Sequence, residues 1–382
     1  PQRTARDVLR TPDDQTRFAY TVTTQLAWVA VDGGAVRPIG VPVALASAEL
    51  SPDEKVVLVQ RFMLPAPLGF PASLFPRRVE LWPTDGGAPI ALGDVPLNDR
   101  SAIASVAPLG PREFTFAPDG RSLVFKRLKV PYYSGEFQKL WRHDLATGRN
   151  TPLTENLDLS IGDVAFSSDG ATLWITAEDK GSVPVFRLNA DGSGLTAVQR
   201  AGTAASLVAR GGSVVFLHST AARPDDLFAL NPGTGESRRL TQLNDALLAQ
   251  LDLGKSEEYW FEGAAGARVH GWLYFPPGYD ASQRYPLVQL MHGGPHTMNR
   301  DAWSYRWNAH VLAAPGYVVT WVNRHGSTGF GEKYSRSILG EWGDKPLEDI
   351  LKSTDFLLAR MPNLDPKRSE EHTSELQSRQ YL

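Results

Sequence analysis

The sequence contains no cysteine, and this absence removes several kinds of chemistry at once. Disulfide bridges, thiolate metal sites and a cysteine nucleophile are all excluded. A cytoplasmic protein and a periplasmic or secreted one can both lack cysteine, so we assign no compartment.

Long apolar runs and an excess of one charge are also lacking. The longest apolar stretches, residues 286–291 and 317–322, are far shorter than the ~18 residues that a membrane-spanning helix needs. The 39 Lys and Arg are balanced by 42 Asp and Glu, which leaves a net charge of −3 and no basic cluster. We therefore expect a soluble protein with neither a membrane nor a nucleic acid as its partner.

The length of 382 residues predicts two domains rather than one. Residue 1 is Pro rather than Met, and no signal-peptide pattern precedes it. We therefore expect the natural N-terminus to lie upstream of Pro1.

The first two-thirds of the chain repeats a turn followed by an apolar strand. In these turns Pro presets φ, Asp hydrogen-bonds within its own turn, and Gly accepts a positive φ. The copies are SPDE at 51–54, APDG at 117–120, SSDG at 167–170 and a weaker RGG at 210–212.

A second repeated element joins two strands through a polar turn with glycine. Five copies give a period of ~50 residues, which is typical of four-stranded propeller blades. We predict an incomplete all-β propeller over residues 1–253, because closed propellers need more blades; a β-sandwich or irregular β-domain is the alternative. The copies lie at residues 28–34, 81–86, 140–148, 186–192 and 228–235.

The pattern changes near residue 254, where a second domain of the α/β class is expected over residues 254–367. An antiparallel hairpin follows from Glu258. Strands at 286–291 and 317–322 then alternate with a helix-like stretch at 303–312 and a helix that begins at Asp344 and Pro346, which predicts a parallel sheet. Its expected apolar face consists of Leu347, Ile350, Leu351, Thr354, Leu358 and Met361.

A glycine-rich turn follows directly on the strand at 286–291. Gly293 and Gly294 let the backbone approach a reacting group, and in α/β-hydrolases such a turn supplies one arm of the oxyanion hole. A simple tight turn is the alternative. His292 and His296 have the spacing of metal ligands, but Gly-Gly-Pro between them cannot form a helix, so we predict no metal site.

A second glycine-rich loop, residues 323–331, follows the strand at 317–322. It lacks the ending of a P-loop and the spacing of a dinucleotide fingerprint, so we predict no cofactor. Ser327 does not fit a nucleophile elbow, because position 325 is His rather than Gly. We expect the loop to shape the rim of a site through Asn323, His325 and Gly326.

These segments together resemble the prolyl oligopeptidase family of serine peptidases. Residues 269–368 resemble the first part of its peptidase domain, in the dipeptidyl- and acylaminoacyl-peptidase branch. TTQLAWVAVDGG and FPRRVELW resemble its propellers, including those of glutamyl-endopeptidase-like members. The matching pieces are GWLYFPPGYD, YPLVQLMHGGPH, WSYRWN, GYVVTWVNRHGSTGFGEKY and WGDKPLEDILKSTDFL followed by NLDPKR.

The resemblance implies a Ser-His-Asp hydrolase of short peptides, with a propeller that restricts access to the active site. It places His292 where the family has an oxyanion contributor. His325 departs from the arginine common in this loop of the family.

The catalytic triad that the resemblance implies is absent from these residues. No Gly-x-Ser-x-Gly occurs in the sequence, and the family's acid and histidine lie further on. Asp349 and Asp355 are expected on a surface-type helix, and His372 lies in the final segment, so none is assigned to the triad. We predict that the 382-residue polypeptide is inactive and poorly soluble.

Residues 368–382 do not continue the family pattern. They have no apolar run and are not expected to form a central strand. RSEEHTSELQS matches the translation of a common sequencing adapter, so we expect a non-native tail after about Lys367.

Two other functions fit the same residues. One is an esterase of the same fold, although the predicted propeller favours a peptidase. The other is a non-enzymatic binding protein whose propeller binds a partner and whose hydrolase part is vestigial.

Overall fold

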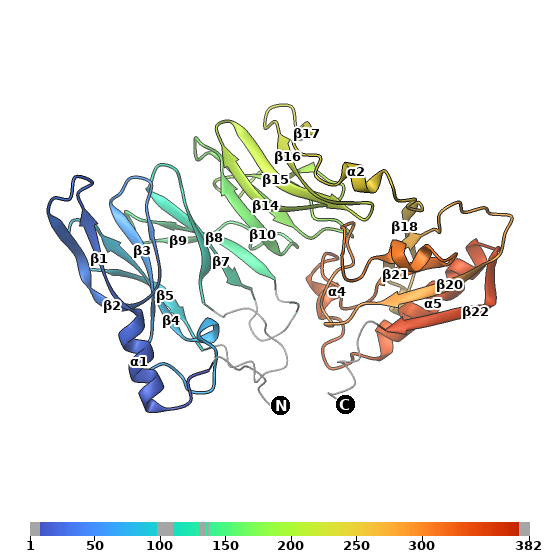
Figure 1. The fold of residues 1–382 in the computed structure, drawn as a ribbon, viewed down its shortest axis with the longest axis horizontal. Helices are drawn as coiled ribbons and strands as arrows, with labels where there is room; N and C mark the ends of the chain where they lie inside the picture. The colour runs from blue at the N-terminus through green and yellow to red at the C-terminus, as the bar shows by residue number, and fades with distance from the viewer. Residues whose placement is uncertain (1–7, 98–109, 130–134, 136, 374–382) are drawn as a thin grey trace. The chain divides into compact units, whose positions relative to one another are not determined.

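A computed structural model describes residues 8–97, 110–129, 135 and 137–373 of the chain (Figure 1). The chain divides into two compact units, Pro1–Glu155 and Asn156–Leu382. The predicted domain boundary after residue 253 lies inside the second unit, in the segment that follows the last antiparallel sheet, and it stays a prediction.

The first unit contains two antiparallel sheets in which successive strands pair in chain order. The first sheet has five strands and the second has four. Their strands are β1 (Thr23–Val29), β2 (Val36–Leu50), β3 (Val56–Phe62), β4 (Arg77–Pro83) and β5 (Ile90–Val95), then β6 (Arg112–Phe116), β7 (Ser122–Leu128), β8 (Gln138–Asp144) and β9 (Asn150–Pro152).

The second unit begins with two further antiparallel sheets of four strands each. Four sheets built in this way are consistent with a propeller-like domain. Their strands are β10 (Ile161–Phe166), β11 (Thr172–Ala177), β12 (Val185–Asn189) and β13 (Thr196–Gln199), then β14 (Thr203–Arg210), β15 (Ser213–Thr220), β16 (Arg223–Leu230) and β17 (Ser237–Arg239).

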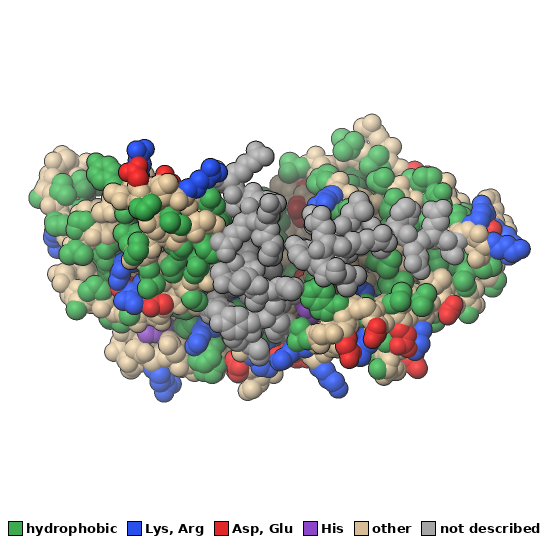
Figure 2. All heavy atoms as spheres, turned by 90° about the horizontal axis from the view of Figure 1, so that it is seen from below, with side chains coloured by type: hydrophobic (Ala, Val, Ile, Leu, Met, Phe, Trp, Pro, Cys, Tyr) green, Lys and Arg blue, Asp and Glu red, His purple; other side chains and the backbone are tan. Residues whose placement is uncertain are grey.

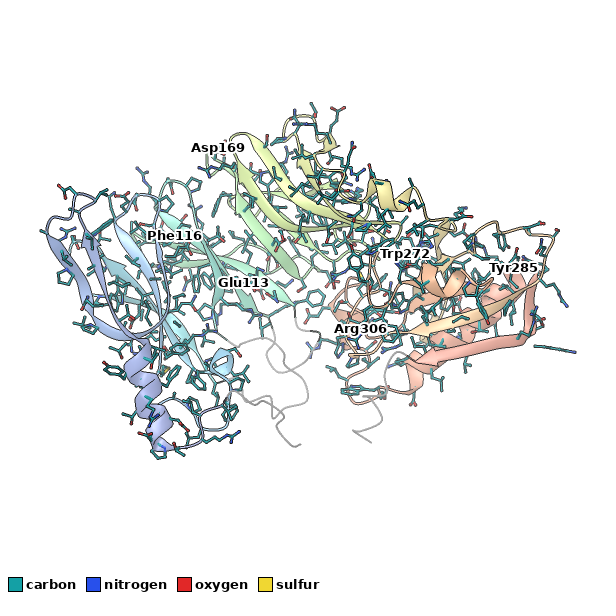
Figure 3. All side chains as sticks on the ribbon, in the orientation of Figure 1. Glu113, Phe116, Asp169, Trp272, Tyr285 and Arg306 are labelled. Carbon is teal, nitrogen blue, oxygen red and sulfur yellow. The ribbon has the colours of Figure 1, made fainter. Side chains whose placement is uncertain are left out.

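The turns of both repeated elements lie between strands, as predicted. Of the five copies of the second element, however, one does not form a sheet of its own. The turn at 167–170 joins β10 to β11, and Figure 3 shows Asp169 at its tip. The Asp169 carboxylate accepts the Ser167 hydroxyl at 2.6 Å and the Ala171 N–H at 3.0 Å, which closes the turn. The copy at 28–34 instead joins β1 to β2 within the five-stranded sheet, so the described residues contain four sheets in this region.

The β-rich region also contains a helix that the strand pattern did not predict. Helix α1 (Pro12–Val22) begins with a capping box, in which the Thr11 hydroxyl accepts the Asp14 N–H and the Asp14 carboxylate accepts the Thr11 N–H. Thr, Pro and Asp at these positions are a recognisable start signal for a helix. The all-β prediction for residues 1–253 did not include this helix.

A mixed sheet of five strands completes the second unit, in the order β18-β19-β21-β20-β22. The expected hairpin and both expected strands are present, and β20 pairs in parallel with β21 and with β22. The strands are β18 (Ser256–Glu262), β19 (Arg268–Tyr274), β20 (Tyr285–Met291), β21 (Val318–Asn323) and β22 (Leu364–Thr373). Tyr285, labelled in Figure 3, marks the start of β20.

Apolar side chains cover both faces of this sheet. On one face Tyr259, Leu287 and Val322 pack against α5 (Asp344–Arg360); on the other, Val288 and Val319 pack against α3 (Ala309–Ala313). The helix expected at 303–312 is shorter than predicted, because α3 begins only at Ala309. Short helices α2 (Asp245–Leu248) and α4 (Glu332–Arg336) and the 3₁₀ turns η1 (Ala72–Leu74) and η2 (Ala264–Gly266) complete the described elements.

Helix α5 starts at Asp344 as expected, but the face that it packs on the sheet differs in part from the predicted one. Leu347 and Leu351, expected in the core, are 53% and 50% exposed. The buried side chains include the polar residues Asp349 and Ser353. The predicted face is therefore correct at Ile350, Leu358 and Met361, which lie in or against the apolar core, and wrong at Leu347 and Leu351.

The final segment extends the sheet further than the sequence suggested. The backbone of β22 runs in register with β20 from Leu287, opposite Ser369, to Met291, opposite Thr373. The strand lies at the edge of the described sheet, where backbone pairing alone can hold a polar segment. The expectation excluded a central strand here and did not foresee an edge strand.

Acidic and basic side chains alternate with hydrophobic ones over the face seen in Figure 2. This mixture agrees with the near-balance of charge in the sequence. Among the described residues, no helix is both long and apolar enough to cross a bilayer.

Candidate active site

The glycine-rich turn lies at the carboxyl end of β20. The chain leaves β20 for β21 on one side and later returns to β22 on the other, so β20 lies at a switch point of the parallel strands. Open α/β sheets bind ligands outside the carboxyl ends of the strands at such a point. The topology therefore places Gly293 and Gly294 where a site is expected.

The turn is open at Gly294. This residue has a φ of +68°, which favours glycine, and a Cβ added there would have no described atom within 4 Å. Gly294 is exposed and Gly293 is half-buried. A substrate can therefore approach the backbone of the turn closely. The oxyanion role of the two glycines stays a prediction.

The side chain of His292 lies inside the protein, at 6% exposure. Its Nε2 lies 2.8 Å from the Ser327 hydroxyl, and its Nδ1 lies 3.1 Å from the Gly293 carbonyl. Burial, together with the positive charge of Arg324, lowers the pKa of His292 to about 3, so the imidazole is neutral at pH 7. The ring fills the space between the two glycine-rich loops.

The contact between Ser327 and His292 does not make a nucleophile and its base. Ser327 is fully buried, and its hydroxyl lies 2.7 Å from the Arg324 carbonyl. A histidine with a pKa of about 3 is a poor general base near neutral pH. The serine therefore has a structural role, in agreement with the expectation for this loop.

Asn323 joins three segments rather than facing a ligand. Its side-chain oxygen accepts the Asn299 N–H at 2.7 Å, and its amide donates to the Asn299 carbonyl at 2.8 Å and to His270 Nδ1 at 2.9 Å. Burial lowers the pKa of His270 to about 4, so this histidine is a neutral acceptor. Asn323 thus holds the segment that follows the glycine turn, and its role at the rim of a site stays a prediction.

His325 forms a buried pair with Asp349, which overturns the expectation of a surface position for this aspartate. The Asp349 carboxylate is 0% exposed and accepts His325 N–H at 2.6 Å, lies 2.7 Å from His325 Nδ1, and accepts Ala264 N–H at 2.7 Å. Asp349 lies on the buried face of α5. A prediction based on the spacing of apolar residues does not count an aspartate, so it missed this position. Asp355, by contrast, is exposed as expected.

Gly326 is required by the packing of its own loop. It has a φ of +92°, and a Cβ there would lie 2.2 Å from Ile338 Cδ1. Its carbonyl lies 3.0 Å from His296 Nδ1, so the backbone of the second loop contacts the first.

Arg324 links the two loops, and the sequence analysis did not single it out. Its guanidinium donates to the carbonyls of His292 at 3.0 Å, His325 at 3.1 Å and Pro295 at 3.4 Å. An arginine directly after a buried strand, facing a Gly-Gly turn on the neighbouring strand, is the signal that could have indicated it.

The two histidines considered as metal ligands contact different partners, Ser327 for His292 and Gly326 for His296. Within the described residues, no group of three or more His, Asp or Glu side chains converges as metal ligands do.

Comparison with known proteins finds one family and several relatives that resemble this chain. The model of the prolyl oligopeptidase family matches residues 303–369. Probable dipeptidyl-peptidase 5 of Emericella nidulans is 32% identical over 262 residues, which cover 66% of this chain and 36% of the relative. Over these residues the chain is similar to the prolyl oligopeptidase family. Dipeptidyl-peptidase 5 of Porphyromonas gingivalis is a further match in this family, 27% identical over 66% of this chain and 37% of the relative.

A solved structure shares the fold of this chain. Pyrococcus horikoshii acylaminoacyl peptidase matches with a TM-score of 0.68 at 19% identity, over 92% of this chain and 51% of that one. The chain spans 36% and 37% of the length of the two dipeptidyl-peptidase relatives that it matches.

Proposed function

We propose that these residues are the propeller and the first part of the hydrolase domain of a serine peptidase that acts on short peptides. The observation that carries the proposal is the exposed Gly293-Gly294 turn at the carboxyl end of β20. Similarity to dipeptidyl-peptidases supports a peptide substrate. In this proposal the mixed sheet is the first part of an α/β-hydrolase sheet.

The mechanism divides between this turn and a triad outside these residues. A serine attacks the peptide carbonyl with His as the general base, and negative charge develops on the carbonyl oxygen. A backbone N–H of the glycine turn donates a hydrogen bond to that oxygen, a contact worth ~3–4 kcal/mol of transition-state stabilisation in serine peptidases. The sequence contains no Gly-x-Ser-x-Gly, so we propose that the 382-residue polypeptide does not itself hydrolyse peptides.

Two measurements test this proposal. A dipeptidyl-naphthylamide assay of the 382-residue chain, with the Porphyromonas gingivalis relative as a positive control, is expected to show no turnover. Turnover that a serine-directed fluorophosphonate blocks would contradict the inactivity of the chain.

The second measurement reads genomic DNA beyond the codon for Arg368. A frame that encodes a strand, Gly-x-Ser-x-Gly-Gly and later Asp and His supports the peptidase, and its product should cleave the same substrates. A stop codon after Leu382 in genomic DNA would instead favour the non-enzymatic binding protein.

A further inference from the structure

The conformation of the glycine turn depends on a neighbouring loop. The segment His292–Pro295 contains two glycines and lies outside the strand pairing of the sheet. Glycine has the greatest backbone freedom of any residue, so such a segment needs external contacts to keep one conformation. The loop after β21 supplies these contacts.

Arg324 makes the contacts that reach the backbone of the turn. Its Nη2 donates to the His292 carbonyl at 3.0 Å, directly before the first glycine, and its Nη1 lies 3.4 Å from the Pro295 carbonyl, directly after the second. One rigid planar guanidinium therefore holds both ends of the Gly-Gly pair. Lysine, a single point donor, reaches fewer carbonyls from the same position.

The loop that carries Arg324 is in turn held by helix α5. The Asp349 carboxylate accepts the backbone N–H of His325 and also lies 2.7 Å from His325 Nδ1. Two contacts therefore hold His325, the residue next to Arg324. The same carboxylate accepts the Ala264 N–H, which ties the loop and the helix to the β18–β19 connection. Gly263 allows this close approach, since a Cβ there would lie 2.4 Å from Asp349 Oδ1.

We propose that Arg324 is a positioning residue that holds the Gly293-Gly294 turn open, and that Asp349 keeps Arg324 in place through His325. The benefit to catalysis rests on the proposed peptidase function, whereas the coupling between α5 and the turn does not. Hydrogen-bond donors that are already in position stabilise a developing oxyanion without any reorganisation of the protein. A turn that is held in one conformation therefore favours catalysis.

Amide hydrogen exchange of the 382-residue chain tests the coupling without any activity assay. Arg324→Met, which removes all three carbonyl contacts, is expected to raise exchange in peptides covering 292–296 about tenfold. Arg324→Lys restores part of the contacts, so an intermediate rate is expected. Arg300→Met is the matched control: Arg300 is exposed, pairs with Glu178 at 3.6 Å, and should leave residues 292–296 unchanged.

The role of Asp349 is tested with an isosteric pair on the same helix. Asp349→Asn should raise exchange in peptides covering both 292–296 and 324–328, whereas Asp355→Asn, on the exposed face of α5, should change neither. Leu357→Ala, which removes a fully buried side chain from α5, provides a variant with general loss of stability.

Two outcomes would overturn the proposal. One is unchanged exchange of 292–296 in a folded Arg324→Met protein. The other is a rise in the exchange of residues 292–296 in Leu357→Ala that equals the rise in Arg324→Met, when the two proteins have the same urea midpoint. General destabilisation would then account for the effect. Failure of the peptidase proposal leaves these results intact, and loss of the coupling leaves the peptidase proposal intact.

Discussion

The turns of the antiparallel sheets and the loops of the mixed sheet use the same residue types in different ways. In the turn at 167–170, Asp169 contacts residues two positions away on either side. In the mixed sheet, Asp349 contacts His325 and Ala264, which are 24 and 85 positions away. An aspartate therefore closes one turn in the first case and joins three segments in the second.

This difference predicts where substitutions are costly. A turn residue stabilises a structure that its neighbours in sequence also favour. A buried residue with distant partners leaves several donors without an acceptor when it is removed. The expected effects below run from the largest to the smallest.

Asp349→Ala should give the largest loss of stability. The substitution leaves the Ala264 and His325 backbone N–H groups and the His325 ring without their buried acceptor. Each buried donor that is left without an acceptor costs about 1–3 kcal/mol. Urea unfolding followed by fluorescence measures this loss. A change no larger than that of Asp355→Ala would show that the pair does not stabilise the fold.

Stability should fall as the pH is lowered from 6.5 to 4. Folded His270 has a pKa of about 4 and His292 of about 3, whereas unfolded histidine binds a proton near pH 6.5. The unfolded state therefore binds more protons in this window. The stability is fully present above pH 6.5 and is lost toward acid, by about 3 kcal/mol for His270 at pH 4.

The contribution of His270 is separated by substitution. His270→Gln should show a shallower fall of the urea midpoint between pH 6.5 and 4 than the unsubstituted protein. Parallel curves for the two proteins would contradict a buried, neutral His270.

Gly326→Ala should destabilise more than Gly294→Ala. Both residues have a positive φ, which costs an alanine about 1–2 kcal/mol. Only Gly326 adds a steric clash, with Ile338 Cδ1 at 2.2 Å, and overpacking costs about 1–3 kcal/mol more. Thermal unfolding of the two variants measures the difference. Equal losses would show that the loop moves away from Ile338 at little cost.

Gly148→Ala, in the turn between β8 and β9, should have an effect as small as that of Gly294→Ala. Its φ is +68°, and no described atom lies within 4 Å of an added Cβ. The expected loss is about 1 kcal/mol from backbone strain alone. A loss as large as that of Gly326→Ala would erase the distinction between local turns and packed loops.

The candidate site was predictable in its position and only partly in its contacts. Gly293 and Gly294 were found from the sequence because two adjacent glycines directly after an apolar strand form a local pattern. Arg324 was missed, because its partners are carbonyl groups, which any residue can supply and which leave no pattern in the sequence.

Local sequence patterns were enough to predict the repeated strands and their Asp- and Gly-containing turns, the hairpin of β18 and β19 and the start of α5 at Asp344, but not the edge strand β22. These features depend on side-chain alternation and on contacts within a few residues, which neighbouring positions encode directly. Long-range packing was needed to show that α5 buries Asp349 and Ser353, and how Arg324 and Asp349 hold the two loops. Those contacts join residues far apart in the chain, and their hydrogen bonds exist only once the sheet has brought the segments together.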